Sequence, residues 1–337
     1  MLLIKSHAAR LLWICLLSLS GLSACSAIPA TTPNTNIYAE FIDQMVVKHQ
    51  FDREQLTQLL SGAEKQQSIL KAMSSPAEKR LQWHSYRKIF LKPTRINGGV
   101  KFWQDNKAIL EAASAKYGVP AEIIVAIIGV ETRYGSNTGS YRVLDALTTL
   151  GFHFPKRARF FKSELEHFLL LCREEGFDPA KPKGSYAGAM GKSQFIASSY
   201  RAYAVDGDDD KKRDLWSSDA DIIHSIAYYF AKHGWKNSSL ITQQTSLTGT
   251  AFSTALNTSL KPKHTLQQLQ SLAVEVPANV PPATAVKLLK LKQVKGADYW
   301  LAFDNFYVIT RYNHSHLYAM AVYQLSQEIK KGYAKSS

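Results

Sequence analysis

Cysteine is scarce in this 337-residue chain, and its scarcity limits how the fold is held together. There are three cysteines, and Cys15 and Cys25 fall in an N-terminal stretch that we expect to be removed or modified. Only Cys172 then remains, which excludes an intramolecular disulfide. Because Cys172 follows the apolar run 168–171, we predict a core residue rather than a nucleophile.

The N-terminus has no apolar run long enough to cross a membrane. The run from Leu11 to Leu19 is interrupted only by Ser18, and nine helical residues fall well short of a hydrocarbon layer of roughly 30 Å. It follows Lys5 and Arg10, so residues 1–24 are predicted to be an export signal.

The end of that signal, Leu22-Ser23-Ala24-Cys25, resembles the lipobox of bacterial lipoproteins, in which the cysteine thiol carries the lipid. The alternative is an ordinary cleaved signal whose boundary happens to contain a cysteine. Ser26 follows in place of an aspartate, which in lipoproteins implies the outer membrane. We therefore expect a lipid anchor on Cys25 that holds the protein at the outer membrane, facing the periplasm.

Acidic residues are in the minority, with 27 Asp and Glu against 41 Lys and Arg. Removal of residues 1–24 leaves 313 residues with an excess of 12 positive charges, enough chain for one large domain or two smaller ones. A basic surface favours nucleic acid, anionic lipid or an anionic wall polymer. Export and the absence of a nucleic-acid motif exclude the first of these.

The chain also lacks an internal repeat, and its hydrophobic pattern is mostly helical. We predict a mainly α fold, α+β overall, with a helix near 266–272, strands near 286–291 and 306–310, and a last helix over 317–330. The expected regions are a flexible tether (25–36), an N-terminal helical region (37–115), a core that holds nearly all the candidate chemistry (116–235), a small mixed insertion (236–305) and a C-terminal segment (306–337).

Glu131 is the most informative carboxylate. It lies near the end of a predicted helix that starts at Pro120 and runs through the apolar residues 123–130. On a 3.6-residue period it extends the apolar face, so burial should raise its pKa. A carboxylic acid that stays protonated suits general-acid cleavage of a glycosidic bond. The alternative is an ion pair with Arg133 that only ends the helix.

A second catalytic carboxylate is missing, although ordinary glycosidases use two. Glu164 and Glu166 are predicted to lie on a solvated helix face, and Asp145 could be a structural cap. The pattern therefore offers no partner for Glu131.

Small residues are dense in the segment 184–195, Gly-Ser-Tyr-Ala-Gly-Ala-Met-Gly-Lys-Ser-Gln-Phe. They allow the backbone to approach either another helix or a bulky ligand. Gln194 could hold a sugar amide or hydroxyl, or it could be incidental to a tight turn.

An acidic loop follows, with Asp206, Asp208 and Asp210 at positions 1, 3 and 5 of an EF-hand-like pattern. The carbonyl of Lys212 and the carboxylate of Asp214 would fall at positions 7 and 9, and Asp221 could close the site. Lys211 replaces the usual glycine at position 6, and Ser217 replaces the usual glutamate at position 12. We expect a structural calcium site; the alternative is a solvated acidic turn.

Aromatic residues mix with Asn and Arg between Phe306 and Tyr318, a composition that suits carbohydrate binding but also occurs at ordinary corners. His314 and His316 are predicted to be surface residues rather than metal ligands, because no third ligand accompanies them.

Together these segments resemble the membrane-bound lytic murein transglycosylase B family, from about Tyr38 to Leu325. The resemblance is carried by Gly129–Gly135 (GVETRYG), Ser185–Gly191 (SYAGAMG) with Gln194-Phe195, the loop Asp206–Trp216, His233-Gly234-Trp235, and Thr310–Ser315 (TRYNHS). It implies a lysozyme-like helical catalytic domain around a glycan cleft, with extra N-terminal helices.

The resemblance also assigns residues. Glu131 matches the catalytic glutamate, and Asp206, Asp208, Asp210 and Asp221 match the metal loop. The positions that match cleft residues are Tyr86, Arg157, Ser185, Gln194, Tyr229, Tyr312, Asn313 and Tyr318. Lys156 and Phe160 stand where other members carry Arg and Tyr, a departure that concerns contacts to the peptide side of the substrate.

The implied activity is cleavage of the bond between N-acetylmuramic acid and N-acetylglucosamine in peptidoglycan, leaving 1,6-anhydromuramyl ends. Glu131 would act as acid and then as base, so no second carboxylate and no cofactor are required. The implied partners are glycan strands, membrane lipid and wall-synthesis proteins. A hydrolytic muramidase and a non-catalytic wall-binding lipoprotein are the alternatives.

Overall fold

The structure is a computed structural model that describes residues 37–74 and 81–336. The predicted export signal (1–24), the tether (25–36) and Cys25 lie outside the described residues. The described residues belong to one compact unit. Before residue 120 its described helices are α1 (Ala39–His49), α2 (Arg53–Ser61), α3 (Gln67–Ser74), α4 (Trp83–Phe90), α5 (Pro93–Asp105) and α6 (Lys107–Tyr117). The helical pattern predicted from residue 37 to about 116 is confirmed.

The middle of the chain is also helical. Its elements are α7 (Ala121–Thr132), β1 (Tyr141–Arg142), α8 (Val143–His153), the short 3-10 helix Pro155–Arg157, α9 (Ala158–Glu175), β2 (Lys183–Gly184), α10 (Ala197–Tyr203) and α11 (Asp219–Lys232). The two short strands pair antiparallel, with Tyr141 opposite Gly184. This pair brings the start of α8 next to the small-residue segment.

The last third contains a small sheet and two closing helices. In order they are β3 (Thr242–Thr245), the 3-10 helix Ala251–Ala255, β4 (His264–Thr265), α12 (Leu266–Ser271), β5 (Ala285–Lys292), β6 (Ala297–Ala302), α13 (Asp304–Tyr312) and α14 (His316–Ser336). The four strands form an antiparallel sheet in the order β3-β6-β5-β4. The helix predicted near 266–272, the strand near 286–291 and the last helix are confirmed.

The strand predicted at 306–310 is wrong, because this stretch is part of helix α13. Its buried side chains include Asn305, Phe306, Val308 and Ile309, a spacing that gives one face of a helix rather than one face of a strand. That face packs against α14.

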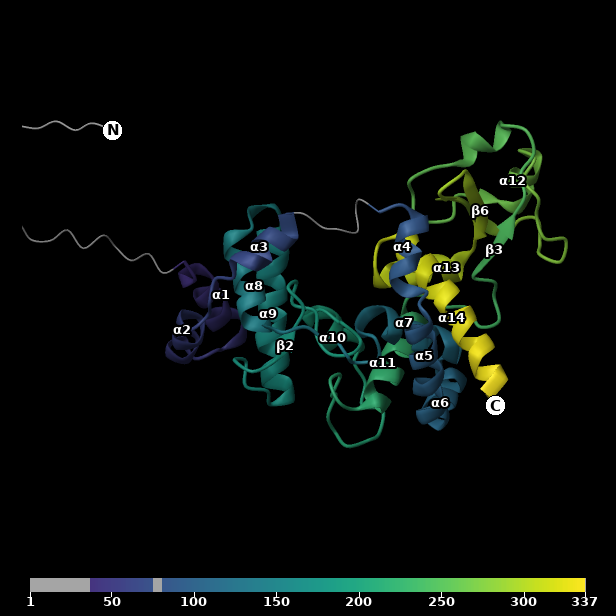
Figure 1. Ribbon diagram of the computed structural model, residues 1–337. Helices are drawn as coiled ribbons and strands as arrows, with labels where there is room; N and C mark the ends of the chain where they lie inside the picture. Colours follow the sequence, from purple (N-terminus) through teal and green to yellow (C-terminus); the bar gives the residue numbers. More distant parts are fainter. Residues whose placement is uncertain (1–36, 75–80, 337) are drawn as a thin grey trace, which may run out of the picture. The chain divides into compact units, whose positions relative to one another are not determined.

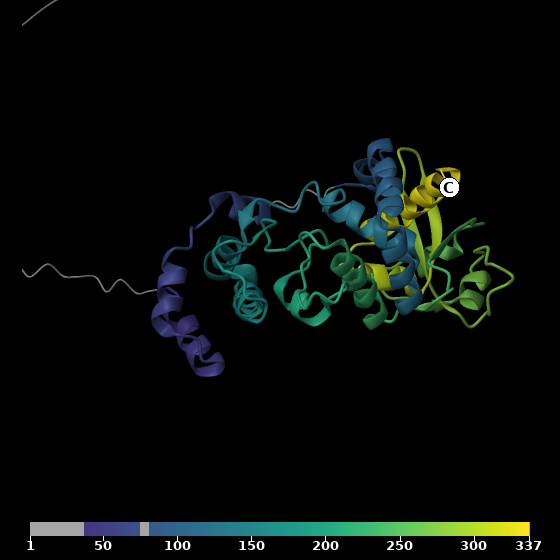
Figure 2. The same ribbon diagram turned by 90° about the horizontal axis from the view of Figure 1, so that it is seen from below.

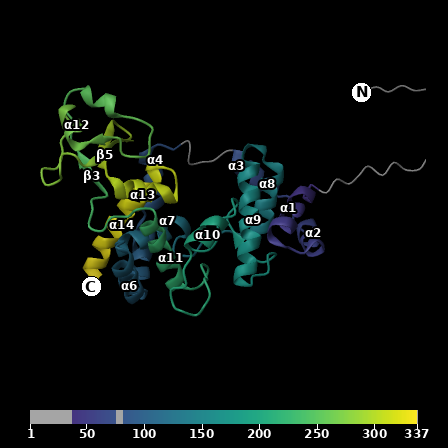
Figure 3. The same cartoon turned by 180° about the vertical axis from the view of Figure 1, so that it is seen from behind.

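Helices distant in sequence pack into two groups (Figures 1 and 3). In one group α8 contacts α9 and α3, and α9 contacts α10, with α1 and α2 nearby. In the other, α14 packs against α7 and α5, and α11 packs against α6 and α7. Helix α7 has a continuous run of buried side chains from Glu122 to Val130, so it lies at the centre of the second group.

The strands of the sheet lie at the same end of the fold as the yellow C-terminal helix (Figure 2). The sheet carries apolar side chains on both faces. Val286 and Leu288 of β5 join a small core with Leu266 and Leu269 of α12. The alternate residues Leu289 and Leu291 join the main helical core. The segment 236–305 therefore has a core of its own on one face and is attached to the helices by the other.

The described residues include no single helix that could cross a membrane. Within that part of the chain, α6 and α7 together have the length and apolar composition of a membrane span, but their axes meet at a bend of 113°.

Candidate active site

Helix α7 carries Glu131 in its last turn, where the side chain is half-buried. The helix begins at Ala121, one residue later than predicted, and Pro120 is its N-cap. Arg133 ends the helix in the left-handed region, with φ of 52°, and Tyr134 follows at 59°. Two successive non-glycine residues in this region cost conformational energy, so surrounding contacts must hold the turn.

Tyr134 supplies much of that support. Its hydroxyl donates to the carbonyl oxygen of Arg95 on α5 at 2.8 Å, and its ring stacks on Phe102. The ring reaches α5 because Gly129 has no side chain: a Cβ there would lie 2.4 Å from the Tyr134 hydroxyl oxygen. The glycine in Gly-Val-Glu-Thr-Arg-Tyr therefore makes room for the tyrosine five residues later.

Thr132 ties the same turn to the small-residue segment. Its hydroxyl donates to the carbonyl oxygen of Lys192 at 3.1 Å and accepts from the N–H of Gly135 at 3.0 Å. In that segment Gly191 has φ of 68°, and a Cβ on it would lie 2.2 Å from the carbonyl oxygen of Leu215. At Gly191 the close backbone approach is therefore to the protein itself and not to a ligand.

Two buried tyrosines, Tyr318 and Tyr312, lie near the Glu131 carboxylate. Tyr318, at the start of α14, donates from its hydroxyl to Glu131 Oε1 at 2.5 Å. Burial raises the pKa of Tyr318 well above its ordinary value, and the nearby charge of Glu131 raises this pKa further. The pKa of Tyr312 is raised by the same two causes. Both phenols therefore stay protonated at any physiological pH, and Tyr318 acts as a donor.

Tyr86 of α4 is part of this cluster, since it interacts electrostatically with Tyr318. Its side chain is only 1% exposed and its ring packs against Phe90, with 5.1 Å between ring centroids. Tyr86 therefore supports Tyr318 from within the core more than it offers a surface to a ligand.

The other carboxylates that the sequence singles out are engaged in structural contacts. Asp145 is buried, pairs with Arg142 at 2.7 Å and accepts from the N–H of Glu64, which confirms its structural role. The prediction of a solvated face for Glu164 and Glu166 is wrong, because α9 packs against other helices on that side.

Glu164 is buried and accepts from the N–H and the hydroxyl of Ser198 at 2.9 and 2.7 Å. Glu166 accepts from Lys48 and His49 of α1. Its pKa is lowered: burial works to raise it, and the hydrogen bonds from Lys48 and His49 outweigh that effect. Neither carboxylate is available as a second catalytic group.

A cavity of about 540 Å³ brings together four of the predicted cleft residues, Arg157, Gln194, Tyr229 and Tyr312. The charge of Glu131 contributes to the raised pKa of Tyr312, so this tyrosine lies both in the cavity wall and near the carboxylate. Phe160 lines the same cavity, and its ring lies 4.1 Å from the Arg157 guanidinium carbon. Phe160 thus offers a flat apolar face against which the Arg157 guanidinium packs.

The cleft tyrosines also join distant segments. Tyr312 donates to the carbonyl oxygen of Ser193 at 2.6 Å, and Tyr229 donates to the carbonyl oxygen of Arg311 at 2.7 Å. Gln194, which has φ of 52°, donates its amide group to the carbonyl oxygens of Thr138 and Gly191. In the part of the chain that the structure describes, the amide oxygen of Gln194 accepts no hydrogen bond and is available to a ligand donor.

Other predicted cleft residues have structural contacts of their own. The Ser185 hydroxyl accepts from the N–H groups of Ala187 and Ala189, so it shapes the turn that contains it. Asn313 is half-exposed at the end of α13. His314 is exposed as predicted, but His316 is partly buried, and burial lowers its pKa to about 4.

The cavity also has lining residues that were not predicted as ligand contacts, and two of them are rings packed near Tyr229. Tyr203 and His233 line the cavity with Tyr229, and the His233 ring stacks on Tyr229 with 4.0 Å between centroids. His233 lies four residues after Tyr229 at the end of α11, a spacing that places both on one helix face. That spacing is the signal that could have identified it.

The acidic loop brings three predicted metal ligands together. One carboxylate oxygen from each of Asp206, Asp208 and Asp210 lies within 4.8 Å of the others. Asp221 is outside this cluster: its two oxygens accept from the N–H groups of Gly207 and Asp214 at 2.7 and 2.6 Å. Asp214 accepts from the N–H groups of Trp216 and Ser217. Both carboxylates therefore shape the loop.

The loop fits a hard cation in two respects. Asp206 Oδ1 is buried and has no hydrogen-bond partner among the described residues, while Oδ2 accepts from the N–H of Lys211 at 2.7 Å. Lys211 adopts φ of 69°, the left-handed conformation for which position 6 normally uses glycine. The lysine therefore leaves the course of the loop intact, at a conformational cost of about 1 kcal/mol.

The single remaining cysteine has the predicted location. Cys172 is buried, and burial raises the pKa of its thiol to about 12, so it is an inert core residue.

Comparison with known proteins places this chain in a family. Residues 34–327 match the family described as Transglycosylase SLT domain. The chain is 43% identical over 309 residues to the membrane-bound lytic murein transglycosylase B of Escherichia coli strain K12, covering 89% of this chain and 83% of the relative.

Solved structures agree. The lytic transglycosylase SltB1 of Pseudomonas aeruginosa has a TM-score of 0.85 and 46% identity, covering 89% of this chain and 98% of that one. The E. coli lytic transglycosylase Slt35 in complex with calcium has a TM-score of 0.82 and 42% identity, covering 89% and 95%. SltB3 of P. aeruginosa in complex with NAG-anhNAM-pentapeptide has a TM-score of 0.77 and 29% identity, covering 86% and 78%. The predicted mainly α, lysozyme-like fold is confirmed.

Proposed function

Because this chain belongs to the transglycosylase SLT domain family and is a peptidoglycan lytic transglycosylase, we propose that Glu131 carries its chemistry, first as acid and then as base. In the first step the Glu131 carboxyl group protonates the oxygen that links N-acetylmuramic acid to N-acetylglucosamine. The C1–O bond breaks, and the electron-poor C1 is stabilised by the sugar's own N-acetyl group or by the Glu131 charge.

In the second step the Glu131 carboxylate removes the proton from the C6 hydroxyl of the same muramyl sugar. The C6 oxygen bonds to C1 and closes a 1,6-anhydro ring, and Glu131 is again protonated. No water is consumed. An internal nucleophile has a high effective concentration, so no second protein base is needed to activate water.

The contact between Tyr318 and Glu131 is the observation that carries this proposal. A phenol that stays protonated donates to the carboxylate formed in the first step and so stabilises it until it takes the second proton. Glu164, Glu166 and Asp145 are held elsewhere, which leaves Glu131 to perform both proton transfers.

The test is Glu131→Gln on purified sacculi. We expect loss of cleavage with retained glycan binding, because glutamine keeps the shape of the side chain and cannot give up a proton. Mass spectrometry of the wild-type products should show anhydro ends, lighter by one water than the reducing ends that a hydrolytic muramidase would leave. Cleavage by the variant would contradict the assignment, and a wild type that binds without cleaving would indicate a wall-binding lipoprotein.

We further propose that the cavity beside Glu131 binds the glycan strand. Arg157, Gln194, Tyr229 and Tyr312 line it. Ser185, Asn313, Tyr318 and Tyr86 belong to the same proposed site, with Tyr86 acting through Tyr318. SltB3 was solved with a NAG-anhNAM-pentapeptide, a ligand of the class proposed here.

A structural calcium is proposed for the acidic loop, with Asp206, Asp208 and Asp210 as side-chain ligands and Lys212 as a carbonyl ligand. The unpartnered oxygen of Asp206 supports this, and Slt35 was solved with calcium. The ion would hold the loop in one conformation without taking part in the reaction. Asp221 would stabilise the same loop by accepting hydrogen bonds from the N–H groups of Gly207 and Asp214.

We also propose that the enzyme is associated with a membrane in the periplasm, since its E. coli relative is membrane-bound. The finer proposal is an acyl chain on Cys25 and location at the outer membrane. Wall-synthesis proteins are the proposed protein partners at that location.

A further inference from the structure

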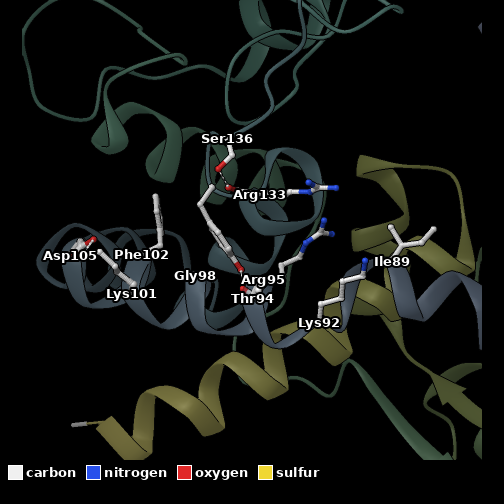
Figure 4. Close-up of a pocket in the computed structure, with 11 residues that line it drawn as sticks. Ile89, Lys92, Thr94, Arg95, Gly98, Lys101, Phe102, Asp105, Arg133 and Ser136 are labelled. Carbon is white, nitrogen blue, oxygen red and sulfur yellow. Dashed lines mark hydrogen bonds and ion pairs between the residues drawn. The ribbon is translucent and has the colours of Figure 1, made fainter.

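A second cavity, of about 550 Å³, lies beside the turn that follows Glu131 (Figure 4). It is formed by the end of α4, the first turns of α5 and the residues Arg133–Ser136. Four basic residues line it, Lys92, Arg95, Lys101 and Arg133, against one acidic residue, Asp105. Lys101 and Asp105 pair with each other at 2.9 Å, so the excess charge is on the other three.

Arg95 is the unusual member of this group. Its side chain is 92% buried, and its Nη1 is buried with no hydrogen-bond partner among the described residues. The guanidinium stacks over the Phe90 ring at 5.0 Å, which offsets only part of its desolvation. Because an arginine stays protonated, this is a buried charge whose donors are not satisfied by the residues described around it.

Arg133 and Lys92 flank Arg95 from two different elements. In Figure 4 the charged ends of all three lie on the same side of the cavity, toward Ile89. Arg133 and Lys92 are exposed, and neither forms an ion pair within residues 37–74 and 81–336. Lys92 is also the N-cap of the 13-residue helix α5, whose positive dipole end faces the same space.

Three cations without a counter-charge would bind an oxyanion, and a planar guanidinium fork matches a carboxylate with two parallel hydrogen bonds. The cavity begins two residues after Glu131, on a turn that Tyr134 fixes to α5. We propose that Arg95, Arg133 and Lys92 bind a carboxylate of the peptide side arm of the glycan strand. This rests on the proposed function and adds a peptide-specific contact to it.

The test compares peptide-bearing glycan strands with strands whose peptides have been removed. In the exposed double variant Lys92→Gln/Arg133→Gln, we expect the ratio of kcat/KM for peptide-bearing over peptide-free strands to fall about tenfold or more, as for loss of a charged hydrogen bond. Arg95→Lys keeps the charge and loses the fork, and it should lower the ratio in the same direction. Lys88→Gln removes an exposed charge from α4 outside the cavity and should leave the ratio unchanged.

An unchanged ratio in the double variant would overturn the site while leaving anhydro product formation, and hence the proposed function, intact. A wild type that forms no anhydro ends from either strand would instead contradict the proposed function; binding of a peptide-bearing fragment to Glu131→Gln would then test the site alone. Inorganic phosphate tests a free-anion site. Stabilisation by phosphate that the double variant loses, with equal kcat/KM on both strands, would overturn the peptide assignment.

Discussion

In the proposed mechanism the Glu131 carboxylate gives and then takes a proton, and the hydroxyl of Tyr318 donates a hydrogen bond to it. A donor to a carboxylate favours its charged form. In the proposed mechanism the contact therefore favours the second step, in which Glu131 is the base, and opposes the first, in which it is the acid.

Tyr318→Phe should lower kcat/KM roughly tenfold to a hundredfold, the usual value of a hydrogen bond to a charged group. Since the carboxylate loses a donor, Glu131 should hold its proton to higher pH. The alkaline limb of the pH–rate profile should therefore shift to higher pH. The limb cannot come from Tyr318 itself, because burial and the Glu131 charge raise the pKa of Tyr318 well above its ordinary value.

Tyr299→Phe is the matched control, since its ring packs on Phe252 in the sheet region and its hydroxyl makes no hydrogen bond to a described residue. An unmoved alkaline limb in Tyr318→Phe would show that the contact does not bear on catalysis.

The sequence pattern predicts the role of some of these residues and not of others. Glu131 stands out because a carboxylate continues an apolar helix face, a purely local pattern. The Tyr318 contact spans 187 residues, so no spacing rule reveals it. The burial of Glu164 also escapes local reasoning, because the partner that satisfies it, Ser198, comes from another helix.

At the scale of single elements, α7 depends on how closely Tyr134 packs onto it. Gly129→Ala would place a Cβ 2.4 Å from the Tyr134 hydroxyl oxygen, so the ring must move and lose its contact to α5. We expect a loss of about 1–3 kcal/mol in the free energy of unfolding, and a melting temperature lower by several degrees.

Gly62→Ala is the control for that measurement. A Cβ on Gly62 meets nothing closer than 3.5 Å, and its φ of −84° suits alanine. Equal melting temperatures for the two variants would mean that the Tyr134 packing is not tight.

The acidic loop gives a second prediction at this scale. Calcium should raise the melting temperature and chelation should lower it, because an ion that binds only the folded state stabilises it by mass action, by about 2.7 kcal/mol at a hundredfold excess over Kd. Asp206→Asn should abolish the calcium-dependent increment, while Asp209→Asn, a neighbour outside the cluster, should keep it. The same melting temperature with calcium and with chelator would argue against the site.

Element types were predictable where one period dominates, as in β5, α12 and α14. The prediction of a strand at 306–310 was wrong because its β-branched and aromatic residues favour a strand. In the structure, Phe306, Ile309 and their neighbours form a helix that packs against α14. Tertiary contacts therefore decided the element, and these contacts come from residues further along the chain.

At the scale of the whole molecule, residues 37–336 are expected to provide the activity and the proposed anchor at Cys25 the attachment to a membrane. Cys25→Ser should move the protein from the membrane fraction to the soluble fraction, because the thiol that would carry the lipid is gone. Its activity on isolated sacculi should stay the same, since the catalytic residues all lie within residues 37–336. Fractionation by ultracentrifugation measures the first effect, and continued sedimentation with membranes would exclude Cys25 as the anchor.

The arrangement of α14 against α7 has a further consequence for when the enzyme becomes active. Tyr318 and Tyr312 belong to the last part of the chain, and both bond to groups on segments made much earlier, Glu131 and Ser193. A chain still emerging from the ribosome carries Glu131 without its hydroxyl donor and without the ring that Tyr312 contributes to the cavity. If these contacts are needed for cleavage, the order of the chain makes the site complete only after the C-terminal helix has docked.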